Sequence, residues 1–283
     1  MATFYNQATL SYNGTVTNSN ITTGELLEVT SLVKTSIGDE YSPGGTVSYA
    51  VSYTNVGGTA ISGITVTDDL GGFTEGGNTV YPLEYIEGSV KYFVNGVLTD
   101  APEVSAGPPL VISGISVPAG GNVLILYAVR TNEFTPRASG STVTNTVAAV
   151  GEGIENASDS TTVTVRDEKH LTISKSICPE SVTGGNTVNY TFVIQNSGNT
   201  PAVATDNLVV SDLFDPILTD ITVTLDGNTL VSGTDYTYDE GTGNFATKES
   251  VITVPAATYV TDPETGAIST TPGVAVLKIS GTL

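Results

Sequence analysis

The stretch that decides the fold class of this chain is TVSYAVSYTN (residues 46–55), in which apolar and polar side chains alternate without a break. Alternation with a period of two is typical of a β-strand that has one buried and one solvated face. The residues that follow, VGGTA (56–60), contain the glycines that tight turns favour. We therefore expect a strand over residues 46–55 that ends in a turn.

Stretches of the same kind follow one another along the whole chain. Examples are GITVTDDL (63–70), SVKYFVNGVL (89–98), LVISGISVPAG (110–120) and NVLILYAV (122–129). The dipeptides Asn95-Gly96 and Asp226-Gly227 each lie between two strand-like halves, which is a strong short-range signal for a β-hairpin. No stretch shows a helical period. The sequence therefore predicts an all-β chain built of tandem Ig-like β-sandwiches.

The composition excludes several classes of function. The 283 residues carry 29 Asp and Glu against 9 Lys and Arg, a net charge of −20, so duplex nucleic acid would be repelled. The sequence contains no run of about 20 apolar residues, which a transmembrane helix would need. The single cysteine, Cys178, excludes an intrachain disulfide, and we assign it no role.

Little in the sequence supports turnover chemistry. The one histidine, His170, lies in a polar RDEKH connector, and the sequence contains no Gly-rich phosphate loop, Cys/His cluster or nucleophile elbow. We therefore expect neither an enzyme nor a cofactor. Calcium prefers oxygen ligands, but without EF-hand spacing we expect the acidic loops to be solvated rather than metal-bound. The residues concerned are Asp235, Asp239, Glu240, Asp262 and Glu264.

The chain contains an internal repeat. Residues 34–59 align without a gap to residues 175–200, and residues 122–129 align further on to residues 273–280. The matched pairs include Lys34 with Lys175, Tyr49 with Tyr190, Asn55 with Asn196, and Asp68 with Asp212.

The two copies end differently. The first continues into two further strands joined by a turn (residues 141–168), whereas the second reaches Leu283 soon after its last matched strand. Residues 4–29 align without a gap to the hairpin that the second copy lacks, with Asn6 on Asn145. The sequence therefore predicts one complete domain flanked by two complementary fragments.

This register divides the chain into donor strands (1–33), a complete sandwich (34–166), a linker (167–174) and an incomplete sandwich (175–283). A sandwich without its last strands leaves backbone groups unpaired, and such an edge invites a strand from another molecule. We expect residues 1–30 of the next subunit to complete it in trans. The donor side chains would be Asn6, Ala8, Leu10 and Tyr12.

Donor and acceptor lie at opposite ends of the chain, so this contact is heterologous, and a heterologous contact that does not close into a ring builds an open, head-to-tail filament. Other interpretations remain open. The sequence is a piece excised from a longer repeat array, or residues 1–30 fold back onto their own chain or form a disordered leader.

The repeat resembles a large family of bacterial surface repeats, domain of unknown function eleven. The residues that carry the resemblance are Lys34, Gly45, Val47, Tyr49, Asn55, Gly57, Asp68, Val117, Pro118, Asn145 and, with the hairpin shifted by one residue, Ala148. The resemblance covers nearly all of the chain in two copies, one of them split. It implies Ig-like sandwiches strung along exported surface proteins, with a structural or adhesive role.

Two sets of residues match across the copies, namely Lys34, Asp68 and Asn145, and Lys175, Asp212 and Asn6. In Gram-positive pilin and adhesin domains, a Lys in a first strand condenses with an Asn in a last strand, aided by a carboxylic acid. This chemistry needs an apolar site, in which burial favours the neutral amine that attacks the amide. Alternatively, the lysines extend along the rim of each sandwich and the asparagines cap turns.

We expect the function to be that of a structural subunit of an extracellular fibre on a bacterial cell or spore surface, with the chain itself as its partner. The alternative is a ligand-binding adhesin segment whose loops contact a sugar or a protein. The sequence identifies neither such a ligand nor an anchor protein.

Overall fold

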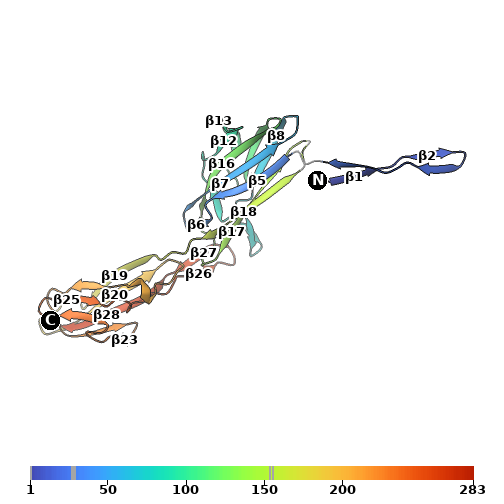
Figure 1. Ribbon diagram of the computed structural model, residues 1–283. Helices are drawn as coiled ribbons and strands as arrows, with labels where there is room; N and C mark the ends of the chain where they lie inside the picture. Colours follow the sequence, from blue (N-terminus) through green and yellow to red (C-terminus); the bar gives the residue numbers. More distant parts are fainter. Residues whose placement is uncertain (1, 27–29, 153, 155) are drawn as a thin grey trace.

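Strands make up nearly all of the regular structure in this chain. A computed structural model describes residues 2–26, 30–152, 154 and 156–283. Within these ranges the one helical element is a 3₁₀ turn, η1 (Ala204–Asp206), and no helix is long and apolar enough to cross a membrane. An N-terminal hairpin is followed by two β domains (Figure 1). The prediction of an all-β chain is confirmed.

The first domain consists of two sheets that share one core. One sheet has the order β13-β12-β16-β7-β5, with β11 also paired to β16, and contains β5 (Thr30–Ile37), β7 (Thr46–Asn55), β11 (Leu83–Tyr85), β12 (Lys91–Val94), β13 (Val97–Thr99) and β16 (Gly121–Thr131). The other has the order β14-β15-β8-β17-β18-β6 and contains β6 (Glu40–Tyr41), β8 (Ile61–Asp68), β14 (Glu103–Ser105), β15 (Leu110–Val117), β17 (Thr142–Val150) and β18 (Ala157–Val165). A small hairpin pairs β9 (Phe73–Glu75) with β10 (Asn78–Val80).

The alternation in residues 46–55 explains the central position of β7. Its inward-facing residues, among them Val47, Tyr49, Val51 and Tyr53, are buried, and it pairs with β5 on one side and β16 on the other. Burying a large apolar side chain stabilises a fold by about 1.5–3 kcal/mol. The apolar face of β7 therefore contributes strongly to the stability of the first domain.

The two dipeptide signals mark hairpins, as predicted. Asn95-Gly96 joins β12 to β13, and Asp226-Gly227 joins β22 to β23. All four residues have positive φ angles, of 49°, 78°, 49° and 81° in chain order. Two-residue hairpin turns of type I′ require positive φ at both central positions, which Asn, Asp and Gly adopt most easily.

The second domain repeats this architecture in part. One sheet has the order β19-β20-β28-β22-β23 and contains β19 (Leu171–Cys178), β20 (Thr187–Asn196), β22 (Thr219–Leu225), β23 (Asn228–Thr229) and β28 (Gly273–Thr282). The other, with the order β21-β25-β24, contains β21 (Ser211–Leu213), β24 (Tyr236–Asp239) and β25 (Asn244–Thr247). A second core lies between them.

The structure corrects our alignment of the last shared strand by one residue. Across the first sheet Tyr127 pairs with Tyr49, whereas in the second domain the matching Tyr190 pairs with Ile279. Ile279 is buried like Tyr127, while Lys278, which our alignment matches to Tyr127, is exposed. A shift by one residue moves every side chain to the opposite face, so burial decides the register.

The linker between the domains is shorter than predicted. β19 begins at Leu171 and pairs along its whole length with β20, so residues 166–170 connect it to β18. The first sandwich likewise begins before Lys34, at Thr30. The repeat alignment begins at the matched lysines, but the backbone ladder continues ahead of them because neighbouring strands still offer partners.

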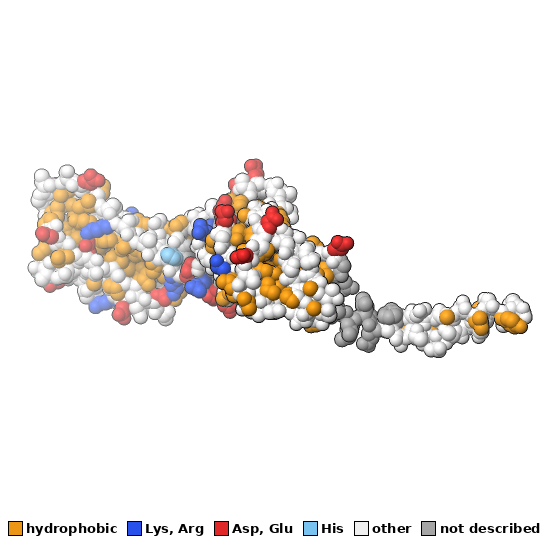
Figure 2. All heavy atoms as spheres, turned by 90° about the horizontal axis from the view of Figure 1, so that it is seen from above, with side chains coloured by type: hydrophobic (Ala, Val, Ile, Leu, Met, Phe, Trp, Pro, Cys, Tyr) orange, Lys and Arg blue, Asp and Glu red, His pale blue; other side chains and the backbone are white. Residues whose placement is uncertain are grey.

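The N-terminal residues form one long hairpin. β1 (Ala2–Asn6) pairs with β4 (Thr22–Leu26), and β2 (Thr9–Tyr12) pairs with β3 (Thr15–Asn18). Residues 5–23 are all exposed, and the hairpin points away from the first domain (Figure 1). Figure 2 shows hydrophobic side chains along it. The described part of the chain therefore leaves both faces of this hairpin uncovered.

A further hairpin connects the two domains. β26 (Thr258–Thr261) and β27 (Ile268–Thr271) project from the second domain onto β10 and loop residues of the first. The contacts run from the Ile268 N–H to the Glu133 carbonyl (2.9 Å), from Asn78 Nδ2 to the Glu264 carbonyl (3.0 Å) and from the Arg137 guanidinium to Thr270 Oγ1 (3.2 Å). At the equivalent position the first domain has a short turn, residues 118–121.

Deleting residues 258–272 and replacing Ala257 with Gly would give the second domain the short turn of the first. We expect this variant to fold, because β28 keeps both neighbouring strands, but to lose the fixed angle between the domains. Both this variant and a control, Val260→Ala at an exposed position, are made in chains without residues 1–26. Small-angle X-ray scattering should show a wider range of shapes for the variant than for the control. Equal scattering from the two variants would mean that the linker alone fixes the angle.

Candidate functional site

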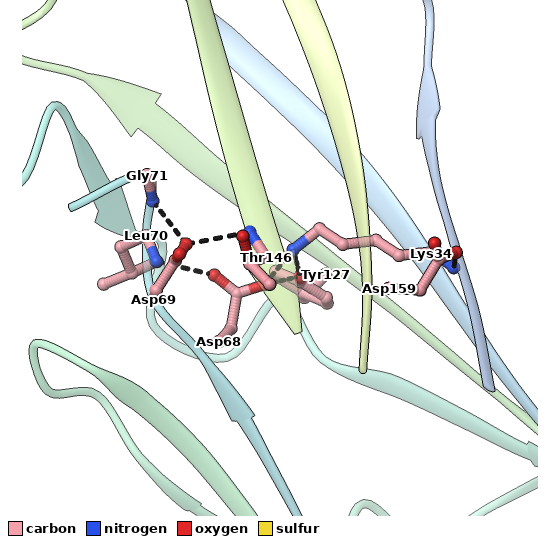
Figure 3. Close-up of polar contacts among 8 residues, drawn as sticks. All are labelled: Lys34, Asp68, Asp69, Leu70, Gly71, Tyr127, Thr146 and Asp159. Carbon is pink, nitrogen blue, oxygen red and sulfur yellow. Dashed lines mark hydrogen bonds and ion pairs between the residues drawn. The ribbon is translucent and has the colours of Figure 1, made fainter. Parts of the chain in front are cut away.

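A lysine occupies a core-facing position in the first domain. Along β5 the inward-facing residues include Leu32 and Lys34, and Lys34 is 3 % exposed. Its ammonium group bonds the Asp68 carboxylate and donates a hydrogen bond to the Tyr127 hydroxyl at 3.0 Å (Figure 3). A buried charge is costly unless it is paired, and these contacts supply the pairing.

Asp68 is the last residue of β8 and is buried between the sheets. Besides Lys34, it accepts hydrogen bonds from the Tyr127 hydroxyl and from the Leu70 N–H, the latter at 2.9 Å. The neighbouring Asp69 accepts a hydrogen bond from the Thr146 N–H of β17 at 2.8 Å (Figure 3). The turn after β8 therefore fixes the Asp68 carboxylate beside β17.

Burial changes the ionisation of the groups around Lys34. Desolvation lowers the pKa of Lys34 below its usual range, although the charge of Asp68 partly offsets this. Desolvation, together with Asp68, raises the pKa of Tyr127, and desolvation also raises the pKa of Tyr49. Relative to water, the site therefore favours a neutral amine and neutral phenols.

Asn145 adds an amide to the same core. It lies on β17, is fully buried, and neither its Oδ1 nor its Nδ2 has a hydrogen-bond partner among the described residues. The amide lies near the Tyr49 hydroxyl, without a hydrogen bond of regular geometry, and Lys34 Nζ lies 4.6 Å from the centre of the Tyr49 ring. An unpaired buried polar group lowers the stability of a fold by about 1–3 kcal/mol. Packing alone therefore does not explain why an asparagine occupies this position.

The first domain therefore gathers three reactive groups around Tyr49. The Lys34 amine is a nucleophile when neutral, the Asp68 carboxyl can carry protons, and the Asn145 amide carbon is an electrophile. Lys34 and Asp68 are in direct contact, and Lys34 and Asn145 both lie next to Tyr49. Groups of these kinds in a dry core are what an isopeptide condensation requires.

The second domain repeats part of this arrangement near its surface. Lys175 of β19 bonds Asp212 of β21, and its Nζ lies 4.6 Å from the centre of the Tyr190 ring. The Lys175 side chain is 39 % exposed, whereas that of Lys34 is 0 % exposed. In the described part of the chain, no asparagine side chain bonds to either Lys175 or Asp212.

The first domain shows what is missing around Lys175. There β18 and β17 lie against β5, and Leu32 is 9 % exposed, whereas the matching Ile173 of β19 is 56 % exposed. β8 lies between β15 and β17, but its equivalent β21 pairs, among the described strands, with β25 alone. An unpaired strand edge and an uncovered apolar face therefore coincide in the second domain.

The strand pair β1–β4 of the N-terminal hairpin has the pairing register of the hairpin that covers this face in the first domain. Nearer the hairpin tip, β2–β3 is shifted by one residue, since Leu10 pairs with Thr17. β17 pairs Asn145 with Thr161, and β1 pairs Asn6 with Thr22. The sequence alignment of the two hairpins relates these pairs residue for residue. The structure leaves Asn6 exposed and does not bring it to Lys175 within the chain.

The other predicted donor residues are exposed as well. Leu10 is 65 % and Tyr12 is 72 % exposed, and Ala8 lies between β1 and β2. Their counterparts in the first domain include Val147 and Ala149, which match Ala8 and Leu10 and are fully buried. The hairpin therefore exposes residues whose counterparts form core in the first domain.

The remaining candidates from the sequence have local structural surroundings. The His170 N–H donates to the Asn196 side chain in the linker region, and Cys178 is exposed at the end of β19. Asp239 and Asp262 accept backbone N–H groups of their own turns, which lower the pKa of both. Within the described ranges, no group of three or more Asp, Glu, His or Cys residues is placed to hold a metal ion.

Sequence reasoning missed Tyr127, which bonds both Lys34 and Asp68. A signal was present, since Tyr127 falls in phase with the buried Val123 and Ile125 of an otherwise aliphatic strand. The hydroxyl of a tyrosine at such a position usually finds a hydrogen-bond partner inside the core.

No protein-family model and no curated protein matches this chain. Among solved structures it is similar to BcpA, the major pilin subunit of Bacillus cereus (13 % identity over 96 % of this chain and 73 % of that one, TM-score 0.35). It is also similar to the pilus backbone RrgB of Streptococcus pneumoniae (13 % identity over 86 % of this chain and 55 % of that one, TM-score 0.34). A third similar structure is AvmM, which catalyses a macrocyclization (12 % identity over 56 % of this chain and 95 % of that one, TM-score 0.30). Similarity at this level assigns no function to the chain.

In chains that carry Asn145→Ala, and so cannot condense, Lys34→Ala should lower the free energy of unfolding of the first domain by about 3–5 kcal/mol. The reason is that Asp68 would remain buried without its counter-charge. Hydrogen exchange of first-domain amides in increasing urea measures the loss. Lys91→Ala, at an exposed position of β12, is the control and should change the value by no more than about 0.5 kcal/mol. Equal effects would show that the ion pair contributes nothing.

Proposed function

We propose that this chain is the structural subunit of an extracellular fibre on a bacterial cell or spore surface, and that it polymerises head to tail by donor-strand complementation. One observation carries this proposal. In the exposed N-terminal hairpin, the strand pair β1–β4 has the register of β17–β18, and the second domain is open where β17–β18 would lie. The resemblance to the surface repeats of domain of unknown function eleven supports the location.

The first domain provides a template for the docked state. There Val147 of β17 pairs with Asp68 and Ala149 pairs with Val66. By equivalence, Ala8 of the incoming hairpin would pair with Asp212, and Leu10 would pair with Val210. The short sheet β21-β25-β24 would thereby gain two strands.

A backbone contact in the first domain has a counterpart in the proposed interface. The Asp159 carboxylate of β18 accepts a hydrogen bond from the Lys34 N–H at 2.7 Å (Figure 3). The hairpin alignment places Asn20 at the position of Asp159. Its side-chain oxygen is an equivalent acceptor for the Lys175 N–H, so the docked hairpin would satisfy this group too.

Docking would remove two sources of unfavourable free energy, an unpaired strand edge and exposed apolar side chains. It pairs the free edge of β21 and covers apolar side chains that are exposed in both partners, among them Leu10 on the hairpin and Ile173 on β19. Each such side chain contributes about 1.5–3 kcal/mol when fully buried. Because the two surfaces lie on different parts of the chain, the contact is heterologous, and it yields an open filament when its rotation does not close a ring.

We further propose that Lys34 and Asn145 are joined by an isopeptide bond within each first domain. The neutral Lys34 Nζ attacks Asn145 Cγ, the amide C–N bond breaks, and ammonia leaves with protons carried by Asp68. Support comes from the unpaired Asn145 amide and from the lowered pKa of Lys34. Such a bond would join the first strand to the last hairpin in a protein with a single cysteine.

The alternative function is that of an adhesin module within a longer repeat array. In that case the hairpin would complete a preceding repeat of the same polypeptide. Failure of the purified chain to polymerise would favour this alternative.

Deleting residues 1–26 should abolish filaments seen by negative-stain electron microscopy and leave the first domain folded, since that domain contains its own β17 and β18. Leu10→Asp should act like the deletion, because it would place a charge in the core of the acceptor. Tyr5→Asp is the matched control, since its first-domain counterpart Thr144 is exposed. Filaments that persist after the deletion would contradict donor-strand docking.

The chain without residues 1–26 should be lighter than its sequence mass by one ammonia molecule, because the bond in the first domain forms without a partner chain. Lys34→Ala or Asn145→Ala should each restore the full sequence mass in this background. Intact-protein mass spectrometry makes the comparison. The sequence mass in the unsubstituted chain would exclude the bond.

A further inference from the structure

We propose that successive subunits are joined covalently, by an isopeptide bond between Lys175 of one subunit and Asn6 of the next. This inference rests on the proposed donor-strand docking and adds to it a chemical step at a defined pair of residues. It makes the second domain an acceptor whose reactive site is completed by a second copy of the chain.

The second domain already holds two of the three groups in bonding contact. Lys175 and Asp212 form an ion pair as Lys34 and Asp68 do in the first domain. The Lys175 amine also lies over aromatic rings, with distances to their centres of 4.6 Å for Tyr190, 5.3 Å for Phe214 and 5.5 Å for Phe192. The amine is therefore oriented towards the inner face of the domain before any partner arrives.

The register of the hairpin identifies the third group. Asn145 pairs with Thr161 in the first domain, and Asn6 pairs with Thr22 in the hairpin. A hairpin that docks on β21 as β17 docks on β8 therefore brings Asn6 to the place that Asn145 occupies beside Lys34. In the first domain Asn145 of the same chain already fills that place. Of the two domains, only the second therefore has a free site for an incoming Asn6.

Docking also supplies the apolar environment that the reaction needs. The side chains of Lys175 and Asp212 are 39 % and 18 % exposed, whereas those of Lys34 and Asp68 are 0 % and 2 % exposed beneath β17 and β18. Removing water disfavours the ammonium form of an amine. The bond should therefore form after docking and not in the free subunit, which prevents reaction at random surface asparagines.

The two sites differ at one position. Ile279 occupies the place of Tyr127, so the hydroxyl that bonds both Lys34 and Asp68 has no counterpart beside Lys175. Asp212 is thus the one described side chain that hydrogen-bonds Lys175, and it would carry the protons by itself.

The reaction is balanced without an added reagent. The Lys175 nitrogen forms a bond to Asn6 Cγ, and the bond from that carbon to the amide nitrogen breaks. Asp212 receives a proton from the attacking nitrogen and transfers it to the departing nitrogen, which leaves as ammonia. No oxidation or reduction takes place, and the product is a secondary amide.

The test compares the same filaments before and after denaturation. Filaments of the wild-type chain are first imaged by negative-stain electron microscopy and then boiled in detergent and separated on a gel. We expect a ladder of covalent oligomers. Tandem mass spectrometry of digested ladder bands should find Lys175 linked to Asn6, in a peptide pair lighter by one ammonia than its two parts.

Lys175→Met and Asn6→Ala should each form filaments that collapse completely to monomer on the gel. The controls are Lys278→Ala, at an exposed position of β28, and Tyr5→Ala, next to Asn6 on β1 and aligned with the exposed Thr144, and both should keep the ladder.

Wild-type filaments that collapse to monomer would overturn the intersubunit bond and leave the proposed docking intact. Absence of filaments from the wild-type chain would instead overturn the docking and, with it, the bond. A ladder whose cross-link joins other residues would also refute this assignment. If a substituted chain forms no filaments, the linked peptide from the wild-type ladder still decides the question.

Discussion

The pairing of β17 with β8 closes the first domain, because it gives β8 a second neighbour and places β17 and β18 against β5. The contact is the condition for burying Leu32 and for excluding water from Lys34 and Asp68. The corresponding strand β21 has a free edge, and the corresponding Ile173 is exposed. The stability of the first domain and the association that we propose for the second therefore have the same physical origin, the need of a sheet edge for a partner.

Burying Lys34 in the core of the sandwich carries a large desolvation penalty. A buried ion pair often stabilises a protein less than apolar residues of the same size would, because desolvation offsets the attraction. Here the cost is increased by Asn145, whose amide lacks a partner among the described residues. Condensation of Lys34 with Asn145 would remove both the lysine charge and the unpaired primary amide. The same groups that weaken the unreacted core are thus the ones that the proposed bond would turn into a covalent link.

Much of the fold could be predicted from local patterns. The alternation in residues 46–55 and the dipeptide Asn95-Gly96 specify a strand and a hairpin through interactions between near neighbours. The position of the last shared strand could not be predicted in this way. Ile279 and Lys278 both lie in an apolar stretch, and only burial against the opposite sheet shows that Ile279 matches Tyr127.

The sequence by itself determined the strand pattern, the repeat, and the equivalence of Asn6 with Asn145, because each depends on side-chain order along the chain. Tertiary structure decided which of the matched lysines is buried. Lys34 and Lys175 occupy the same place in the same pattern, yet one is enclosed and the other is open to water. The difference arises because β17 and β18 cover the first, and burial depends on segments that are distant in sequence and adjacent in space.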